Sequence, residues 1–340
     1  MQKILVIRND KLGDFMLAWP ALSLLKRQYP DTQITVLIPA YTRPMAEICP
    51  WIDNIIIDDQ HHGTLADARY LAKKIRACHF DISISLFLQT RTTLALWLAR
   101  IPQRFGPASK PAQLFLNRRL RQRRSLSLKP EYQYNTDLVR YFISRNGDTV
   151  KDEQQPPYLQ FYRQEITMLR QSYRAQYTID SHTRLVFIHP GNGGSAVNLS
   201  ITQFAELAHR ISEKYPVHFV LTAGPDEKQT ALELSAKIEG INHSLYHSTN
   251  GLVNFAKFIS ICDLFISGST GPLHIAGALN VNTAAFYPAR RSATALRWQT
   301  MNEENKRIYF SPENYIGEQD MALLDMDKCA EKIADFLKEY

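Results

Sequence analysis

The chain contains little cysteine and no long apolar run, and each shortage excludes a class of protein. The 340 residues include four widely separated cysteines without zinc-finger spacing. They also do not form a small secreted scaffold stapled by disulfides. No run approaches the ~18 consecutive apolar residues of a membrane-spanning helix, and the chain begins with a strand pattern instead of a signal peptide. These absences predict a reduced, cytoplasmic protein.

Groups of residues that bind metals are also missing from the sequence. The ten histidines form no metal-binding cluster, and His243 and His247 fall on a strand and loop, where a shared metal is not expected. No Asp-x-Asp pair stands at a strand end in the second half, where it would suit a nucleotide-bound divalent ion. We therefore expect no metal requirement.

Acidic residues are absent from residues 100–129, although this basic segment carries nine Lys and Arg. Residues 1–150 hold 22 Lys and Arg against 12 Asp and Glu, whereas the remainder holds 18 against 21. This imbalance implies an anionic partner for the first half: nucleic acid, anionic lipid or a charged substrate. Apolar residues among the arginines suit a lipid surface, although most charge runs are only solvated faces. No nucleic-acid-binding module is recognisable, so we expect no nucleic-acid partner.

Alternating strand and helix patterns run through both halves of the chain. Unbroken apolar runs, such as residues 3–7 and 184–189, predict strands buried on both faces of a parallel sheet. The pattern therefore predicts two Rossmann-like, doubly wound parallel-sheet domains that face across a cleft. We expect an N-terminal domain over residues 1–155, a linker and connecting helix over 156–180, a C-terminal domain over 181–325 and a terminal helix over 326–340.

The turn after the first strand carries the first candidate site. Lys3–Ile7 is followed by a polar turn and by a helix predicted over Phe15–Tyr29. Ligands of such sheets bind outside the carboxyl ends of the strands, and Asp14 stands there beside Gly13. A carboxylate at this place could remove a proton from a substrate hydroxyl. It could also simply satisfy free amide groups at the start of the helix, which is the commoner role of such a carboxylate.

Two turns in the second half predict an anion site. The segment LFISGSTGPLHIAGA passes from a buried strand through small residues straight into a helix, which leaves the amides of Ser269 to Gly271 free. His274, on that helix, could donate to a phosphate or bond the backbone. The loop HPGNGGSA follows another buried strand and lets backbone amides approach a ligand. Together the turns predict a diphosphate site, unless Ser269 or Thr270 only caps the helix.

Three segments of the sequence resemble the ADP-heptose:lipopolysaccharide heptosyltransferase family. They are KILVIRNDKLGDFMLAWPAL, FIHPGNGGSAVNLSITQFAELAHRI and DLFISGSTGPLHIAGAL, and the resemblance covers nearly the whole chain. It implies the two-domain GT-B fold and a metal-free, inverting transfer of L-glycero-D-manno-heptose from ADP-heptose. The acceptor would be Kdo-lipid A or a heptosylated core of lipopolysaccharide. The protein would be peripheral on the cytoplasmic face of the inner membrane.

The resemblance also assigns roles to individual residues. Asp14 matches the catalytic base. The donor diphosphate would be held by Ser269, Thr270, Gly271, His274, Gly193, Gly194 and Ser195. The donor nucleotide and sugar would lie near Asn192, Asn198, Thr222 and Gly224. The acceptor would be bound by Lys11, Gly13, Arg91, Arg118, Arg119, Arg121, Arg123 and Arg124.

The sequence departs from the family pattern at two places. Many members have an acidic residue where this chain has Ser269, and a lysine in the middle motif where it reads AVNLS. In the family that lysine helps to hold the donor, so another basic residue or the neutral side chains of Asn192, Ser195 and Asn198 would replace it. The alternatives are a GT-B transferase for a different nucleotide sugar, a nucleotide-sugar epimerase, and a non-catalytic relative that binds anions or lipid.

Overall fold

The unbroken apolar runs at residues 3–7 and 184–189 form strands, because helices cover both faces of a doubly wound sheet. The computed structural model describes residues 2–59, 64–194, 197–313 and 320–339. The chain divides into two compact units, unit 1 over Met1–Gln154 and unit 2 over Gln155–Tyr340. This boundary lies one residue from the end expected for the first domain.

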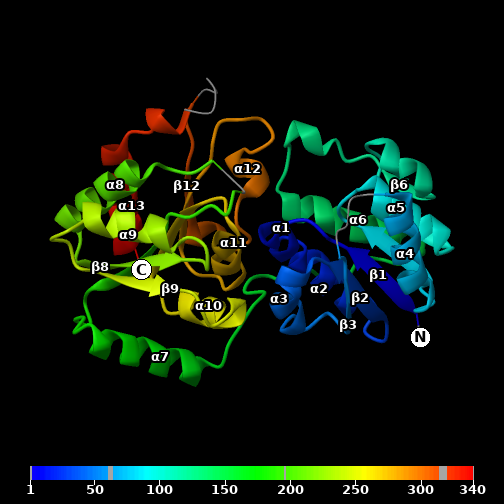
Figure 1. Ribbon diagram of the computed structural model, residues 1–340, viewed down its shortest axis with the longest axis horizontal. Helices are drawn as coiled ribbons and strands as arrows, with labels where there is room; N and C mark the ends of the chain where they lie inside the picture. Colours follow the sequence, from blue (N-terminus) through cyan, green and yellow to red (C-terminus); the bar gives the residue numbers. More distant parts are fainter. Residues whose placement is uncertain (1, 60–63, 195–196, 314–319, 340) are drawn as a thin grey trace. The chain divides into compact units, whose positions relative to one another are not determined.

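Unit 1 is built on one six-stranded sheet in which the paired strands are parallel (Figure 1). Its strands are β1 (Lys3–Ile7), β2 (Gln33–Ile38), β3 (Asn54–Ile57), β4 (Ile82–Ser85), β5 (Gln103–Pro107) and β6 (Arg118–Leu120). Their spatial order is β3-β2-β1-β4-β5-β6. The helices are α1 (Leu12–Met16), α2 (Trp19–Gln28), α3 (Arg43–Glu47), α4 (Leu65–Arg76), α5 (Thr90–Leu98) and α6 (Glu131–Arg145). Short 3-10 turns are η1 (Ala40–Thr42), η2 (Pro111–Phe115) and η3 (Arg124–Leu126).

Helices flank the sheet of unit 1 and bury its apolar side chains. Leu5 of β1 packs in a cluster with Leu71 of α4 and Leu96 of α5. Helix α2 packs against α6, and Phe105 of β5 meets Phe142 of α6 edge-on, with ring centroids 5.2 Å apart. The sheet is therefore held as a rigid layer, and its strand ends are fixed in space.

Unit 2 repeats this architecture with the same strand order. Its strands are β7 (Arg184–His189), β8 (Val217–Ala223), β9 (His243–His247), β10 (Leu264–Gly268), β11 (Thr283–Phe286) and β12 (Arg307–Phe310), and the sheet order is β12-β11-β10-β7-β8-β9. The helices are α7 (Arg163–Gln176), α8 (Ile201–Lys214), α9 (Lys228–Lys237), α10 (Leu252–Ile259), α11 (Gly271–Ala278), α12 (Ala295–Trp298) and α13 (Met326–Lys338), with 3-10 turns η4 (Glu304–Lys306) and η5 (Asp320–Leu323). An apolar cluster joins the sheet to α8, α9 and α13. Read from its own first strand, each sheet has the order 3-2-1-4-5-6 of dinucleotide-binding domains.

The predicted fold class is confirmed, and the differences lie in individual elements. The helix expected over Phe15–Tyr29 is divided into α1 and α2, because Pro20 lacks an amide proton and suits the start of a helix, not its middle. Strands β5, β6 and β12 were not predicted. Strand β6 lies inside the basic segment, where charge hides the strand pattern.

Helix α7 lies within the segment expected to link the domains, and it belongs to unit 2. Tyr173 anchors it, since the hydroxyl of this buried side chain lies 2.6 Å from the hydroxyl of Ser244.

Across the described ranges, no helix is both long and apolar enough to cross a membrane.

Candidate functional site

Each sheet has a topological switch point, where the strand order reverses and ligands of such folds bind. In unit 1 it lies between β1 and β4, and in unit 2 between β7 and β10. The segments that follow these strands contain the candidate residues Asp14, Gly193 and Ser269. The sequence therefore places its candidates at the expected edge of each sheet.

Asp14 is held by an arginine at the carboxyl end of β1. The guanidinium of Arg8 donates from Nη2 to Oδ1 of Asp14, and its Nε lies 3.0 Å from Oδ1 of Asp10. Asp14 lies in the first turn of α1, while the N-cap residue Lys11 makes no side-chain capping bond. The recorded partner of the Asp14 side chain is thus an arginine, so the simple helix-cap interpretation does not describe its contact.

The electrostatics of this cluster favour a carboxyl that takes up a proton. Burial raises the pKa of Asp14, the charge of Arg8 lowers it, and the nearby carboxylate of Glu131 raises it again; the net direction is upward. The pKa of Asp10 is also raised, by burial and by the charge of Asp14. The Asp14 side chain retains 14% of its exposure, against 3% for Arg8. Asp14 therefore combines access to solvent with a raised proton affinity, as a general base requires.

Two further predicted acceptor residues lie at this edge. Gly13 is buried in α1 and Lys11 is exposed. Arg91, at the start of α5, pairs with the buried Asp58 that follows β3. The carboxylate of Asp58 also accepts from Asn9, which follows β1. Arg91 is therefore tied into the strand ends and not extended into solvent.

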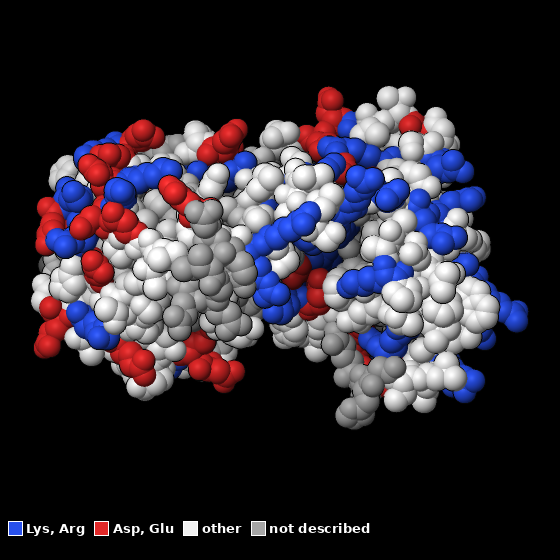
Figure 2. All heavy atoms as spheres, turned by 90° about the horizontal axis from the view of Figure 1, so that it is seen from above, with Lys and Arg blue, Asp and Glu red and all other residues white. Residues whose placement is uncertain are grey.

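The basic segment divides into an exposed and a buried part. Arg118, Arg119, Arg121 and Arg123 are exposed, and Figure 2 shows Lys and Arg side chains spread over unit 1 with few acids among them. Arg124 behaves differently. Its Nη1 donates to Glu131 at 2.7 Å and its side chain is only 15% exposed. A buried carboxylate therefore holds Arg124 in this structure, and its role in binding the acceptor stays a prediction.

In unit 2, the turn after β10 presents amide groups at the start of α11. Thr270 is the N-cap, and its hydroxyl accepts from the amide of Leu273. Its hydroxyl also lies 3.0 Å from that of Ser267, which donates to the carbonyl of His189. Within the described part of the chain, the amides of residues 269–271 form no hydrogen bond. The turn thus contains both a helix cap and a group of donors at the positive end of α11.

His274 lies one turn into α11 and is buried. Burial lowers its pKa to about 4, so the imidazole is neutral at pH 7. Its Nδ1 has no hydrogen-bond partner among the described residues. A neutral imidazole can donate a proton from only one ring nitrogen, so His274 offers a neutral donor and not a positive charge.

In the glycine-rich loop after β7, the amides of Gly193 and Gly194, which were predicted to face a diphosphate, already have acceptors within unit 2. The amide of Gly193 donates to Oε1 of Glu227 at 2.9 Å, and the amide of Gly194 donates to Asn192 at 2.9 Å. Ser195, the third residue expected there, lies outside the described residues. Gly191 allows close packing, since a Cβ on it would lie 2.2 Å from Cδ of Glu227, whereas Gly193 and Gly194 have open space around them and positive φ angles.

Glu227 also occupies the loop after β8. Its Oε2 accepts from the amide of Gly224 at 3.1 Å and lies 3.3 Å from Nε2 of His189, whose Nδ1 lies 3.0 Å from the Thr222 hydroxyl. The bond with His189, together with those from the two amides, lowers the pKa of Glu227 to about 2. Gly193 and Gly224 therefore share Glu227 as their acceptor, and Thr222 is connected to the same carboxylate through His189.

Asn198 connects the loop after β7 with the turn after β10. Its amide donates to the carbonyl of Pro190 at 3.1 Å. A Cβ on Gly268 would lie 2.6 Å from Oδ1 of Asn198. The two turns of unit 2 that were predicted to bind the nucleotide-sugar donor are therefore neighbours in the structure.

Three residues of the site, Arg8, Glu131 and Glu227, were not predicted from the sequence. A signal was available for Glu227, because an acid after the second strand of a dinucleotide-binding sheet commonly meets ribose hydroxyls. Arg8 directly follows an apolar strand and could also have been noticed. No local pattern marks Glu131, which lies 123 residues from Arg8.

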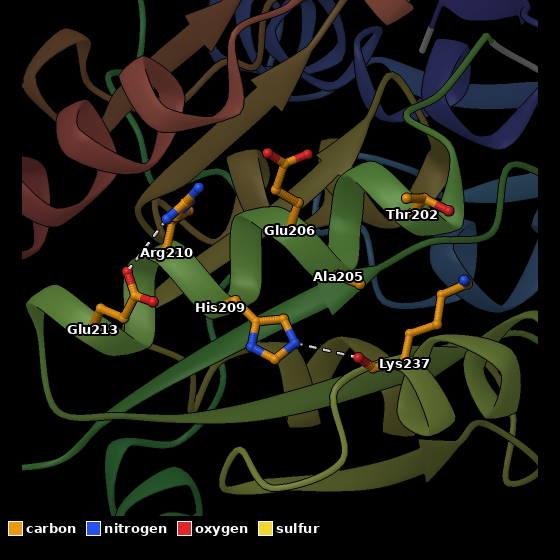
Figure 3. A pocket seen from close by; sticks show the side chains of 7 residues that line it. All are labelled: Thr202, Ala205, Glu206, His209, Arg210, Glu213 and Lys237. Atoms are coloured by element: carbon orange, nitrogen blue, oxygen red, sulfur yellow. Dashed lines mark hydrogen bonds and ion pairs between the residues drawn. The ribbon is translucent and has the colours of Figure 1, made fainter.

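Two other features of the described residues bear on the site. No group of three or more His, Cys, Asp or Glu in the described ranges could hold a metal ion. A pocket of about 420 Å³ lies between α8 and Lys237 at the end of α9 (Figure 3). Its described lining carries both charge signs and includes no residue of the loops after β7, β8 or β10. It is therefore separate from the candidate site.

Comparisons with known proteins agree with this architecture. The family model of glycosyltransferase family 9 (heptosyltransferase) matches residues 68–315. A Haemophilus influenzae protein, provisionally named a glycosyltransferase, is 41% identical over 99% of this chain and 97% of its own. Lipopolysaccharide heptosyltransferase 2 of Escherichia coli is 26% identical over 84% of this chain and 82% of its own. The solved structure of E. coli ADP-heptose lipopolysaccharide heptosyltransferase II has a TM-score of 0.77 at 20% identity and covers 99% of both chains.

Proposed function

We propose a donor, an acceptor and a mechanism for this chain, which belongs to glycosyltransferase family 9 and is a GT-B glycosyltransferase. The donor is ADP-L-glycero-D-manno-heptose and the acceptor is the inner core of lipopolysaccharide, as Kdo-lipid A or a heptosylated core. The names of the relatives support both, since they include lipopolysaccharide heptosyltransferase 2 and an ADP-heptose-dependent enzyme. The observation that carries the mechanism is Asp14, with its raised pKa and its place at the carboxyl edge of β1.

The proposed reaction is a direct displacement that inverts the anomeric centre. Asp14 removes the proton of the acceptor hydroxyl while that oxygen attacks the anomeric carbon. The bond from that carbon to the diphosphate oxygen breaks at the same time, and ADP leaves. Negative charge grows on the leaving diphosphate, and preorganised amide donors stabilise such charge without a metal.

The donor is proposed to contact two different surfaces of unit 2. The free amides of residues 269–271 lie at the positive end of α11 and suit the diphosphate. Glu227 is an acceptor of hydrogen bonds with a strongly lowered pKa, so it suits the ribose hydroxyls and would repel a phosphate. His274 supplies a neutral donor near the same turn.

The acceptor is proposed to lie against the basic side of unit 1. Lys11 and four exposed arginines, namely Arg118, Arg119, Arg121 and Arg123, offer charge for the anionic groups of a glycolipid. The same charges attract an anionic bilayer. We propose that the protein works as a peripheral protein at the cytoplasmic face of the inner membrane.

Replacing Asp14 by asparagine tests the mechanism. The variant should bind ADP-heptose normally but lose roughly 10²–10⁴-fold in kcat, the usual contribution of a general base. In the wild type, kcat/KM should fall as the pH drops through the raised pKa of Asp14, because the protonated carboxyl cannot accept a proton. The variant should lack this pH limb. The exposed Asp59→Asn change, which affects a pair with Lys74, serves as control and should leave kcat unchanged.

A different nucleotide sugar is the second candidate for the donor, because the middle motif lacks the lysine of the family. A panel of ADP-, UDP- and GDP-sugars, compared by thermal shift and by turnover with Kdo-lipid A, separates the two. The main proposal expects ADP-heptose to be preferred and EDTA to leave turnover intact.

Near-normal turnover of Asp14→Asn, with chemistry limiting, would contradict the proposed base.

A further inference from the structure

Arg8 joins Asp14 to a second buried carboxylate on a distant helix. While Nη2 of Arg8 meets Asp14, its Nη1 donates to Oε1 of Glu131 at 3.1 Å and to Oδ1 of Asn135 at 3.2 Å. The carbonyl of Leu86, just after β4, lies 3.3 Å from the same nitrogen. Nη1 of Arg8 is thus surrounded by acceptors, whereas Nη2 donates to Asp14.

Glu131 is the centre of this arrangement. It is the first residue of α6 and retains only 2% of its exposure. The oxygen that accepts from Arg8 also accepts from Nη1 of Arg124 at 2.7 Å. Arg124 is fixed in turn by the carbonyl of Leu86 at 2.9 Å. Burial of a carboxylate is costly unless it is paired, and Glu131 is paired twice.

We propose that Glu131 is a positioning residue for Asp14: it orients Arg8 and offsets its charge, so that Asp14 keeps its affinity for a proton. The proposal rests on the proposed role of Asp14 as the base. Without Glu131, the full charge of Arg8 would act on Asp14 and weaken it as a proton acceptor. Arg124 has the opposite effect on Asp14. It partly neutralises the charge of Glu131, so Glu131 attracts Arg8 less strongly and more of the positive charge of Arg8 acts on Asp14.

The charged groups around Asp14 come from several elements and act with different signs. Arg8 and Lys11 favour the ionised carboxylate, whereas burial and Glu131 favour the protonated form. Asp10 competes for Arg8 from the loop after β1. Tyr41, on η1, senses the charges of Asp10 and Asp14, and its hydroxyl donates to the carbonyl of Asp10.

The test compares Glu131→Gln with the wild type by two measurements. The first is the pKa of Asp14, followed by ¹³C NMR of the side-chain carboxyls in the protein without substrates. The second is the pH profile of kcat/KM with ADP-heptose and Kdo-lipid A. Glutamine keeps the shape and an acceptor oxygen but removes the charge. The pKa of Asp14 should therefore fall, the acid limb should move to lower pH, and kcat on the plateau should drop less than in Asp14→Asn.

A second variant predicts a shift of the opposite sign. Arg124→Gln leaves Glu131 less neutralised, so Glu131 should draw Arg8 away and the pKa of Asp14 should rise. General damage to the fold would not give opposite signs in the two variants. If Glu131→Gln does not fold, the sign of the shift in Arg124→Gln alone decides. Asp137→Asn is the matched control on α6, since Asp137 pairs with Lys129 and Arg140, and it should leave the pKa of Asp14 unchanged.

The outcomes separate this inference from the proposed function. An unmoved pKa of Asp14 in both variants, with Asp14→Asn inactive, overturns the inference and leaves the base in place. Opposite pKa shifts with an active Asp14→Asn overturn the base and show only the electrostatic link. An effect of Arg124→Gln confined to the KM of the acceptor would show that Arg124 binds the acceptor instead.

Discussion

Replacement of Glu227 by glutamine tests the most unexpected contact of unit 2, the carboxylate inside the glycine-rich loop. Glu227 accepts from the amides of Gly193 and Gly224 and lies 3.3 Å from His189. Glutamine has nearly the same volume, but it has no charge and only one acceptor oxygen. In the variant, the side-chain NH₂ group would face the amide or the imidazole that contacts a carboxylate oxygen in the wild type. We therefore expect unit 2 to lose stability while its fold is kept.

The size of the loss follows from the pKa of Glu227. The native state lowers this pKa from 4.5 to about 2, and each pKa unit corresponds to about 1.4 kcal/mol of preference for the ionised form. The upper limit is therefore about 3.5 kcal/mol at pH 7, and hydrogen bonds to charged groups are commonly worth ~1.5–3 kcal/mol. The side chain is 19% exposed, so solvent reduces the value only in part. We expect a loss of ~2–3 kcal/mol.

The lowered pKa of Glu227 also predicts how the difference in stability between the wild type and the variant changes with pH. Above pH 4.5 the carboxylate is ionised in both the native and the unfolded state, and its stabilisation is complete. As the pH falls from 4.5 towards 2, the unfolded state takes up the proton first, and the stabilisation is lost. The difference between the wild type and Glu227→Gln should therefore be full at pH 7 and should shrink below pH 4.5.

Hydrogen–deuterium exchange of peptides from β7 and β8 reports the stability of unit 2, because a chain of two units need not unfold in one step. Measurements from pH 7 to pH 3, corrected for intrinsic exchange, should show the shrinking difference. Glu213→Gln is the control, since Glu213 is 63% exposed and lies 3.8 Å from Arg210. It should change stability by less than about 0.5 kcal/mol. Equal stability of Glu227→Gln and wild type at pH 7, or a difference at pH 3 as large as that at pH 7, would refute the reasoning.

Two more predictions concern the substrates. Gly271→Val should weaken ADP binding at least tenfold, because the side chain obstructs approach to the amides, whereas Ser269→Ala should cost about 0.5–1.5 kcal/mol for one neutral hydrogen bond; a folded Gly271→Val that binds ADP normally, by calorimetry, would place the diphosphate elsewhere. Changing the four exposed arginines of the basic segment to glutamine should raise the KM of the acceptor and weaken liposome binding without altering the Kd of ADP. Salt should weaken the wild-type interaction in the same way, and unchanged acceptor kinetics would mark these arginines as a solvated surface.

The layers of both units could be predicted because buried parallel strands carry their own signal. The runs Lys3–Ile7 and Arg184–His189 are apolar at every position except their ends, and both strands have the bounds that the sequence indicates. Strand β6 has no such signal, because its residues are Arg118, Arg119 and Leu120 and it lies at the sheet edge. Edge strands tolerate charge, so pattern alone cannot separate them from loops.

The sequence could predict which strand ends carry the candidate residues, but not which side chains contact them. The carboxyl ends of β1, β7 and β10 follow from the fold, so Asp14 and Ser269 could be proposed as candidates from the local sequence. The partners that decide their chemistry come from far away in the chain. Glu131 lies 123 residues from Arg8, and Glu227 lies 34 residues from Gly193. Such pairings depend on tertiary packing, which no local spacing encodes.

The two donor turns of unit 2 show why contacts matter more than composition. Both turns are rich in small residues, and both follow strands at the same switch point. The turn after β10 leaves its amides without partners in the described part of the chain, whereas Glu227 accepts from an amide of the β7 loop and another of the β8 loop. The first turn therefore suits anions, and the second suits groups that donate hydrogen bonds, as the proposed donor site requires. A nucleoside diphosphate carries both kinds of group, on its phosphates and on its ribose. The opposite electrostatics of the two turns would thus fix which end of the donor lies at which strand.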